Sequence, residues 1–258
     1  MFGGGGTELR VRVPYVKGIR LLGTVWLHSL RDEGVQFAVL WPRLHESVPG
    51  WLNLGDARWL YALAHHGPGA GAIVEIGSAW GRSTICLASG SKRARRERVY
   101  AIDPHTGEPD FLTDPQRAFI PARWNVPLVS NLLGAAPIPV VGPDFSSLDL
   151  FQANLRRFGV ADWVIPLVCT SHDAASHFDG GPIRMLFVDG LHAYEAVKTD
   201  IEDWVPRVIR GGFIVFDDYY PLGEHAGVQK AVDELVATGA VEPVRRGLGL
   251  THVWTRKR

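Results

Sequence analysis

Short apolar runs alternate with longer amphipathic segments along most of the chain. The runs have the length and the β-branched content of buried strands, and they lie at residues 72–76, 99–102, 164–168, 185–188 and 213–216. Segments with a helical spacing of apolar positions separate them, at residues 56–65, 83–91, 148–158, 193–209 and 228–238. Strands that alternate with helices predict an α/β fold with a doubly wound, mostly parallel sheet.

Two further strands are expected near the end of the chain, at residues 242–246 and 251–255. They are joined by Gly247–Gly249 and predict a hairpin that adds an antiparallel strand. With these two, the expected Rossmann-like sheet has seven strands. We expect Asp56 to cap the first helix, and the pair Gly211 and Gly212 to end the fourth.

Two stretches interrupt this pattern. Residues 1–54 are expected to form an N-terminal extension, which begins with the glycine-rich Met1–Gly6. Its segment Gly18–Arg31 has helical spacing, and such a helix would pack against the main domain, cap the active site or form an oligomer contact. Residues 104–147 are rich in Pro and Gly, and we expect a lid over the substrate because long loops are usually functional or disordered. The main domain then spans residues 55–258.

The composition narrows the class of protein. Apolar residues make up 46% and charged residues 21% of the 258 residues, and the formal net charge is zero, so there is no case for a nucleic-acid surface. We find no apolar stretch of membrane-spanning length and no signal-peptide layout. Cys86 and Cys169 lack metal-ligand spacing and are expected to be free thiols in a reducing compartment. We therefore expect a cytoplasmic protein that acts on neither nucleic acid nor membranes.

The stretch Val74–Ser83 joins a strand to a helix through a glycine turn. Gly77 would let the backbone approach a ligand closely, and Gly81 would let helix and strand pack tightly. A dinucleotide-binding loop reads G-x-G-x-x-G, whereas here Ala79 replaces the second glycine and Glu75 lies in the strand end. An acid at this place suits a cationic ligand better than a polyphosphate. A glycine turn that serves only the fold is the alternative.

Acidic residues lie at the ends of four predicted strands, where parallel sheets bind their ligands. Asp103 follows the second strand and could accept hydrogen bonds from a ribose diol, or only cap the next turn. Asp189, Asp217 and Asp218 follow the fourth and fifth strands. If these strands are neighbours, three crowded carboxylates favour a hard divalent cation such as Mg²⁺. The alternative is that these acids only cap a turn and a helix.

Histidines also lie near the strand ends. His192 follows the fourth strand and could remove a proton from a bound hydroxyl, a task that suits histidine because its unperturbed pKa lies near neutrality. Its alternative role is that of a surface or capping residue at a helix start. His105 and His172 have weaker claims, and Arg184 and Lys198 are expected to be solvated charges.

Four blocks of the sequence carry a resemblance to a known family: Val74–Thr84, Ala101–His105, Leu186–Glu195 and Gly211–Tyr219. Together they resemble class I S-adenosylmethionine-dependent methyltransferases. The likeness is greatest to the metal-dependent sugar O-methyltransferases of macrolide and aminocoumarin pathways, and cephalosporin hydroxylase-like proteins belong to the same broad group. The resemblance covers about residues 55–256, whereas the first 50 residues resemble no family we can name.

The resemblance implies where the cofactor would bind. Glu75, Gly77 and Gly81 would surround its methionine part, and Ser78 and Ser83 would also bind the cofactor. Among these, Glu75 would favour the ammonium group. Asp103 would bind the ribose hydroxyls, Ser171 and His172 would lie near the adenine, and Asp189 would also contact the cofactor.

The resemblance also implies the catalytic groups. Asp189, Asp217 and Asp218 would hold Mg²⁺, and His192 falls where one macrolide-sugar branch carries its general base. The stretch after Asp103 looks longer than the family leads us to expect, so the identity of the acceptor cannot be carried over.

The expected function is therefore a metal-dependent O-methyltransferase that acts on a sugar or another polyhydroxylated natural product, with a homo-oligomer as one possible state. A catechol-type enzyme would bind an aromatic diol through the same kind of metal site, and this alternative function remains open. A nicotinamide-dependent oxidoreductase is disfavoured by Ala79 and by the missing third glycine of its fingerprint. A non-catalytic binding protein would have no need for an acidic metal rim.

Overall fold

The computed structural model describes residues 34–106, 146–219, 226–246 and 252–256. Four of the sequence predictions concern segments outside these ranges in whole or for the most part: the glycine-rich start, the helix at Gly18–Arg31, the lid and the turn at Gly247–Gly249.

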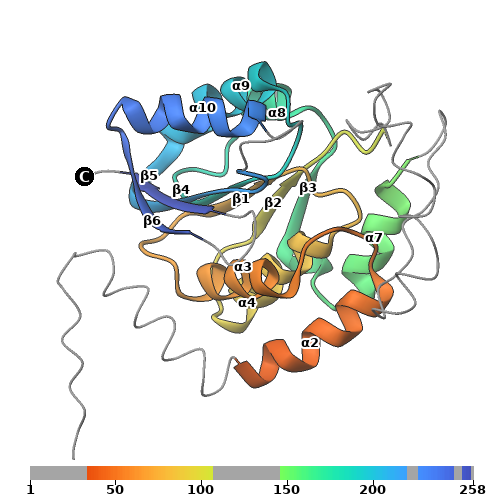
Figure 1. Ribbon diagram of the computed structural model, residues 1–258. Helices are drawn as coiled ribbons and strands as arrows, with labels where there is room; N and C mark the ends of the chain where they lie inside the picture. Colours follow the sequence, from red (N-terminus) through yellow and green to blue (C-terminus); the bar gives the residue numbers. More distant parts are fainter. Residues whose placement is uncertain (1–33, 107–145, 220–225, 247–251, 257–258) are drawn as a thin grey trace, which may run out of the picture.

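A seven-stranded sheet forms the centre of the domain (Figure 1), with the strand order β3-β2-β1-β4-β5-β7-β6. Its strands are β1 (Ala72–Ile76), β2 (Val99–Ile102), β3 (Val164–Leu167), β4 (Ile183–Val188), β5 (Val208–Phe216), β6 (Val241–Arg246) and β7 (His252–Arg256). β1 to β5 pair parallel with one another, and β7 pairs antiparallel with both of its neighbours, β5 and β6. The predicted fold, a mostly parallel seven-stranded sheet with an antiparallel C-terminal strand, is confirmed.

Helices cover both faces of the sheet, as the alternation along the chain requires (Figure 1). One face carries α2 (Gly34–Ser47), α3 (Leu54–His66), α4 (Arg82–Arg93) and α7 (Leu148–Arg157), with the 3₁₀ turn η3 (Ala161–Trp163). The other carries α8 (Ser171–His177), α9 (Tyr194–Trp204) and α10 (Ala226–Ala237), with the 3₁₀ turn η4 (Val205–Arg207). Each face has its own apolar core, so the sheet is buried on both sides.

Two helix boundaries that the sequence assigned to named residues are wrong. Helix α3 begins two residues before Asp56, because Asn53 is its N-cap and accepts a 3.0 Å hydrogen bond from the Asp56 backbone N–H. Helix α9 ends at Trp204 because Pro206 turns the chain into η4, and β5 follows at once. Gly211 and Gly212 therefore lie inside a strand, where the register with β4 shifts.

Arg184 is not the solvated charge that the sequence suggested. Its side chain is fully buried, and its Nε donates a 2.8 Å hydrogen bond to the carboxylate of Glu97. The guanidinium also donates to the carbonyl of Ala64, at the end of α3, at 2.6 Å. Burial lowers the pKa of Arg184, and Glu97 opposes that shift. Lys198, in contrast, is 42% exposed, as expected.

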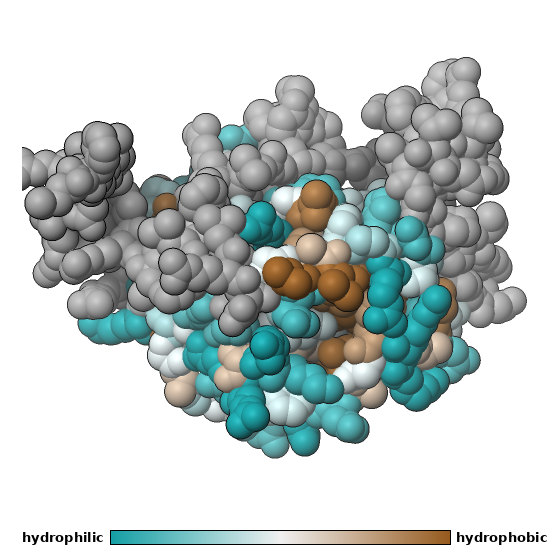
Figure 2. Space-filling view, turned by 90° about the horizontal axis from the view of Figure 1, so that it is seen from below, coloured by the Kyte–Doolittle hydropathy of each residue, from teal (hydrophilic) through white to brown (hydrophobic). Residues whose placement is uncertain are grey.

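The face that α2 covers displays apolar side chains to solvent (Figure 2). Val35 and Val39 lie one helical turn apart on α2 and are 60% and 59% exposed. Among the residues that the structure describes, no helix combines the length and the apolar content needed to cross a membrane. Cys86 and Cys169 are free thiols, as predicted, the first buried and the second half-buried.

Candidate active site at the carboxyl edge of the sheet

Four adjacent parallel strands end at the same level. Ile76 of β1 is paired with Ile102 of β2 and with Val188 of β4, and Val188 is paired with Phe216 of β5. The next residues along the four strands are therefore neighbours at one edge: Asp103, Gly77, Asp189 and Asp217. The order of strands along the chain reverses between β1 and β4, which is where open α/β sheets bind ligands.

The turn after β1 lies directly against the turn after β4. Gly77 has φ 89°, and a Cβ built on it would lie 2.0 Å from the carbonyl oxygen of Asp189. Gly81 also has a positive φ, of 90°, and a Cβ there would lie 3.1 Å from the ring of Phe151. Both glycines thus permit close approaches that other residues would prevent.

Asp103 is oriented by two backbone donors. Its Oδ2 accepts a 2.8 Å hydrogen bond from the N–H of Ala79, and its Oδ1 accepts a 2.7 Å bond from the N–H of His105. Ala79 has φ 42° and His105 has φ 54°, a conformation that is rare for residues other than glycine. Such strain is typical of ligand sites, and here it serves to fix one carboxylate beside the glycine turn.

Glu75 is fully buried behind the same turn. Its Oε2 accepts a 2.5 Å hydrogen bond from the hydroxyl of Thr84, and Ser83 contributes a second side-chain bond. Its Oε1, like the hydroxyl of Ser78, has no hydrogen-bond partner among the described residues. Burial raises the pKa of Glu75 to about 7, against the hydrogen bonds from Ser83 and Thr84, and the charge of Asp103 adds to the rise.

The acids after β4 and β5 repel one another. Loss of solvation raises the pKa of Asp189 well above its usual range, and the charges of Asp217 and Asp218 raise it further. Glu75 and Asp103 add smaller contributions of the same sign. The predicted crowding of carboxylates at this rim is therefore present, and a bound cation would relieve it.

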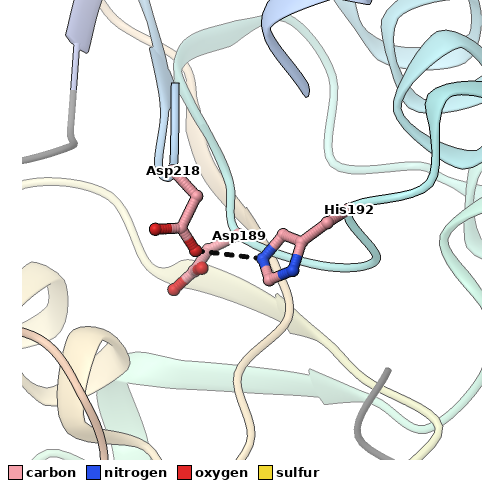
Figure 3. A group of neighbouring side chains, drawn as sticks. All are labelled: Asp189, His192 and Asp218. Carbon is pink, nitrogen blue, oxygen red and sulfur yellow. Dashed lines mark ion pairs between the residues drawn. The ribbon is translucent and has the colours of Figure 1, made fainter. Parts of the chain in front are cut away.

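His192 lies beside these carboxylates and forms an ion pair with Asp218 when its ring is protonated. Its Nε2 lies 3.0 Å from Oδ2 of Asp218, and its ring points from the loop after β4 toward the two carboxylates (Figure 3). Asp189, His192 and Asp218 each offer one ligand atom within 4.8 Å of the others. Asp217 is not a member of this group, although it influences Asp189 through its charge.

Ser171 and His172 face α9. The hydroxyl of Ser171 donates to the carboxylate of Asp200, and Nδ1 of His172 lies 2.7 Å from Oδ2 of Asp203. The bond to Asp203 raises the pKa of His172, which is 67% exposed. These pairs tie α8 to α9, and a contact of the two residues with adenine stays a prediction.

The sequence analysis missed two buried side chains that stabilise the glycine turn and the start of α4 through hydrogen bonds to backbone carbonyls. Arg82 is buried and donates a 2.9 Å hydrogen bond to the carbonyl of Val48, which attaches the segment after α2 to the start of α4. Asn154 of α7 donates a 2.9 Å bond to the carbonyl of Trp80 in the glycine turn. An arginine next to Gly81 was a visible signal, whereas nothing near Asn154 in the sequence points to Trp80. Whether the N-terminal extension caps the site or forms an oligomer contact stays a prediction.

Comparison with known proteins agrees with this site. A family model described as a methyltransferase domain matches residues 74–219, which include the glycine turn and all the acids at the edge. An uncharacterized protein, R132, of Acanthamoeba polyphaga mimivirus is 27% identical over 118 residues, 42% of this chain. The match spans half the length of that relative.

Solved structures share the fold. The O-methyltransferase NovP is 20% identical, with a TM-score of 0.56 over 84% of this chain and 88% of its own. The O-methyltransferase TomG of Streptomyces achromogenes, which takes part in tomaymycin synthesis and was solved with S-adenosylmethionine, is 16% identical, with a TM-score of 0.56 over 95% of this chain and all of its own. At these identities the likeness concerns the fold alone.

Proposed function

The chain belongs to a family of methyltransferase domains, and from this we propose that it is an S-adenosylmethionine-dependent, divalent-metal-dependent O-methyltransferase. The observation that carries the proposal is the meeting of two features at one edge of the sheet. A glycine turn with a buried acid, Glu75, lies against a rim that holds Asp189, His192 and Asp218. The first feature suits a cationic cofactor, and the second suits a metal and a hydroxylated acceptor.

The residues of the glycine turn fit S-adenosylmethionine. Glu75 and Ser78, on either side of Gly77 in the chain, have buried oxygens without partners among the described residues. An ammonium group near Glu75 would favour its ionised form. Asp103 is oriented by two N–H groups and is 17% exposed, so its remaining lone pairs are available to ribose hydroxyls.

The rim fits a divalent cation. Asp189 and Asp218, with Asp217 beside them, supply the carboxylates that Mg²⁺ prefers, and Mg²⁺ usually takes only one or two of them in addition to water. His192 would then stay available as a base. A softer metal would instead take the His192 nitrogen as a ligand. We propose Mg²⁺, because this assignment leaves a proton acceptor at the rim.

When bound, S-adenosylmethionine supplies an activated methyl group, and a divalent cation lowers the pKa of a hydroxyl that it contacts. The side chains of the protein would orient the cofactor and accept the proton of the acceptor hydroxyl. Asp103 and Glu75 would orient the cofactor at the glycine turn, which reduces the entropic cost of alignment. His192 would accept the acceptor's proton, and Asp218, whose Oδ2 lies 3.0 Å from Nε2 of His192, would stabilise the imidazolium that forms.

The acceptor that we propose is a small molecule with neighbouring hydroxyls, a sugar or another polyhydroxylated natural product. An aromatic diol of the catechol kind would use the same residues. A cytoplasmic location agrees with the two free cysteines, and it stays a prediction, as does a homo-oligomer.

Methyl transfer from labelled S-adenosylmethionine to a panel of acceptors tests the proposal. Each sugar with a vicinal diol is paired with its monodeoxy analogue, and catechol is paired with phenol, with Mg²⁺ or with EDTA. We expect label only in the diols and only with metal. Transfer to a sugar diol supports the proposed acceptor class, transfer to catechol alone favours the alternative, and transfer that survives EDTA contradicts the metal requirement.

A further inference from the structure

His105 has a positive φ, which is uncommon for residues other than glycine. It has φ 54°, and its N–H donates the 2.7 Å hydrogen bond that orients Oδ1 of Asp103. Only a few per cent of residues other than glycine have a positive φ, and although histidine is one of the enriched types, this conformation still needs support from neighbouring contacts. The donor that orients Asp103 therefore depends on whatever fixes His105.

The side chain of His105 supplies those contacts. The residue is 2% exposed, and its Nδ1 lies 2.7 Å from the hydroxyl of Ser147. Its ring lies 5.0 Å, between centroids, from the ring of Phe151 in α7. The Ser147 N–H also donates a 3.3 Å hydrogen bond to the carbonyl of His105. Two hydrogen bonds and an aromatic contact thus fasten His105 to the start of α7.

Helix α7 in turn supports the glycine turn. Phe151 packs at the position where Gly81 leaves room, and Asn154 donates to the carbonyl of Trp80. Since Ala79 donates to Asp103, the contacts form a closed ring. The ring runs from the glycine turn through Asp103, His105 and α7 back to the glycine turn.

We propose that His105 is a positioning residue, which holds Asp103 in the orientation that binds the cofactor by anchoring its own left-handed backbone to Ser147 and Phe151. The inference deepens the proposed function and rests on it for the identity of the ligand. The link between His105 and Asp103 itself is a property of this chain and exists without any ligand.

Substitutions of His105 can show whether its Nδ1 or its Nε2 makes the contact that matters for cofactor binding. Asparagine places a polar atom where histidine has Nδ1 and tolerates a positive φ, whereas glutamine places one nearer to Nε2. His105 Nε2 is buried and has no partner among the described residues, so it offers the competing assignment, in which His105 contacts a ligand directly. The pair His105→Asn and His105→Gln separates the two assignments.

The experiment measures the Kd of S-adenosylhomocysteine by calorimetry for His105→Ala, His105→Asn and His105→Gln, each with and without Asp103→Ala. A misoriented carboxylate loses about one charge-assisted hydrogen bond, so we expect His105→Ala and His105→Gln to weaken binding about tenfold. His105→Asn should stay within about threefold of the parent. In the Asp103→Ala background, His105→Ala should change Kd less than twofold, because the group through which it acts is gone.

Two results would overturn the inference: an equal loss for His105→Ala in both backgrounds, or recovery with glutamine but not with asparagine. If the parent protein binds no S-adenosylhomocysteine, the proposed function fails, and urea unfolding of the parent, His105→Ala, Asp103→Ala and the double variant still tests the positioning role. We then expect His105→Ala to lower the free energy of unfolding more in the Asp103 background than in the Asp103→Ala background. Additive effects on unfolding would contradict the link.

Discussion

The backbone of Gly77 leaves no space beside the carbonyl of Asp189, since a Cβ at position 77 would lie 2.0 Å from that oxygen. Gly77 belongs to the turn that we assign to the cofactor, and Asp189 to the rim that we assign to the metal. The N–H of Asp189 also bonds to the carbonyl of Ile76, at 2.9 Å. The two halves of the proposed site are thus in direct backbone contact, and a change in either turn displaces the other.

Gly77→Ala should disrupt this contact. The new Cβ would meet backbone that has no rotamer by which to avoid it, and φ 89° is already strained for alanine. Gly159→Ala is the matched control, because Gly159 has φ 66° and nothing within 4 Å of a built Cβ. We expect Gly77→Ala to lower the free energy of unfolding by about 3 kcal/mol or more and Gly159→Ala by about 1 kcal/mol. Equal losses in urea unfolding would contradict the close contact.

Asp218→Asn should separate metal binding from cofactor binding. Removing one carboxylate from the rim should reduce metal-dependent turnover about 10²-fold or more, while the Kd of S-adenosylhomocysteine stays within about twofold. Asp217→Asn is the companion variant, and it tests the sequence prediction that Asp217 is a metal ligand: a ligand should behave in the same way, whereas a smaller loss of turnover would leave Asp189 and Asp218 as the carboxylate ligands. A parallel loss of turnover and cofactor binding in either variant would mean that the residue is structural.

His192→Ala should lower turnover about 10²–10⁴-fold, the usual contribution of a general base. His192→Gln keeps a polar group near Asp218 but cannot take up the proton, so it should show a similar loss. Turnover like that of the parent in His192→Ala would remove His192 from the mechanism.

Glu75 should make stability depend on pH. The folded state holds the Glu75 proton up to a pKa of about 7, whereas the unfolded chain releases it near 4.5. The folded state therefore binds more protons between these values, and its stability falls as pH rises through that window, by at most about 3 kcal/mol from this group. Glu75→Gln should be less sensitive to pH and more stable than the parent at pH 8 without cofactor. Identical pH dependence of urea unfolding in the two proteins would show that the burial of Glu75 has no such effect.

Much of the arrangement could be inferred from local sequence. The strands that end at Ile76, Ile102, Val188 and Phe216 are mostly apolar, and glycine or aspartate follows each of them, so the edge of the sheet and its acids were predictable. Wrong boundaries arose where two local signals competed. Pro206 ended α9 before the glycine pair that looked like its stop.

The burial of Arg184 and the contact between His105 and Ser147 were not predicted, because both depend on residues that are distant in the sequence. Arg184 looks like any arginine at the start of a strand, and its burial follows from Glu97 and from carbonyls at the end of α3, which only the folded chain brings together. His105 and Ser147 are 42 positions apart and meet only because α7 packs under the glycine turn. Local patterns carry no information about such partners.

Calorimetric titration of the chain with S-adenosylhomocysteine, first with Mg²⁺ and then with EDTA, tests the central claim most directly. We predict binding in the micromolar range that survives chelation, because Glu75, Gly77 and Asp103 lie at the glycine turn, whereas the metal would bind among the acids after β4 and β5. Absence of binding in both conditions would contradict the proposal that this edge of the sheet is a methyltransferase active site.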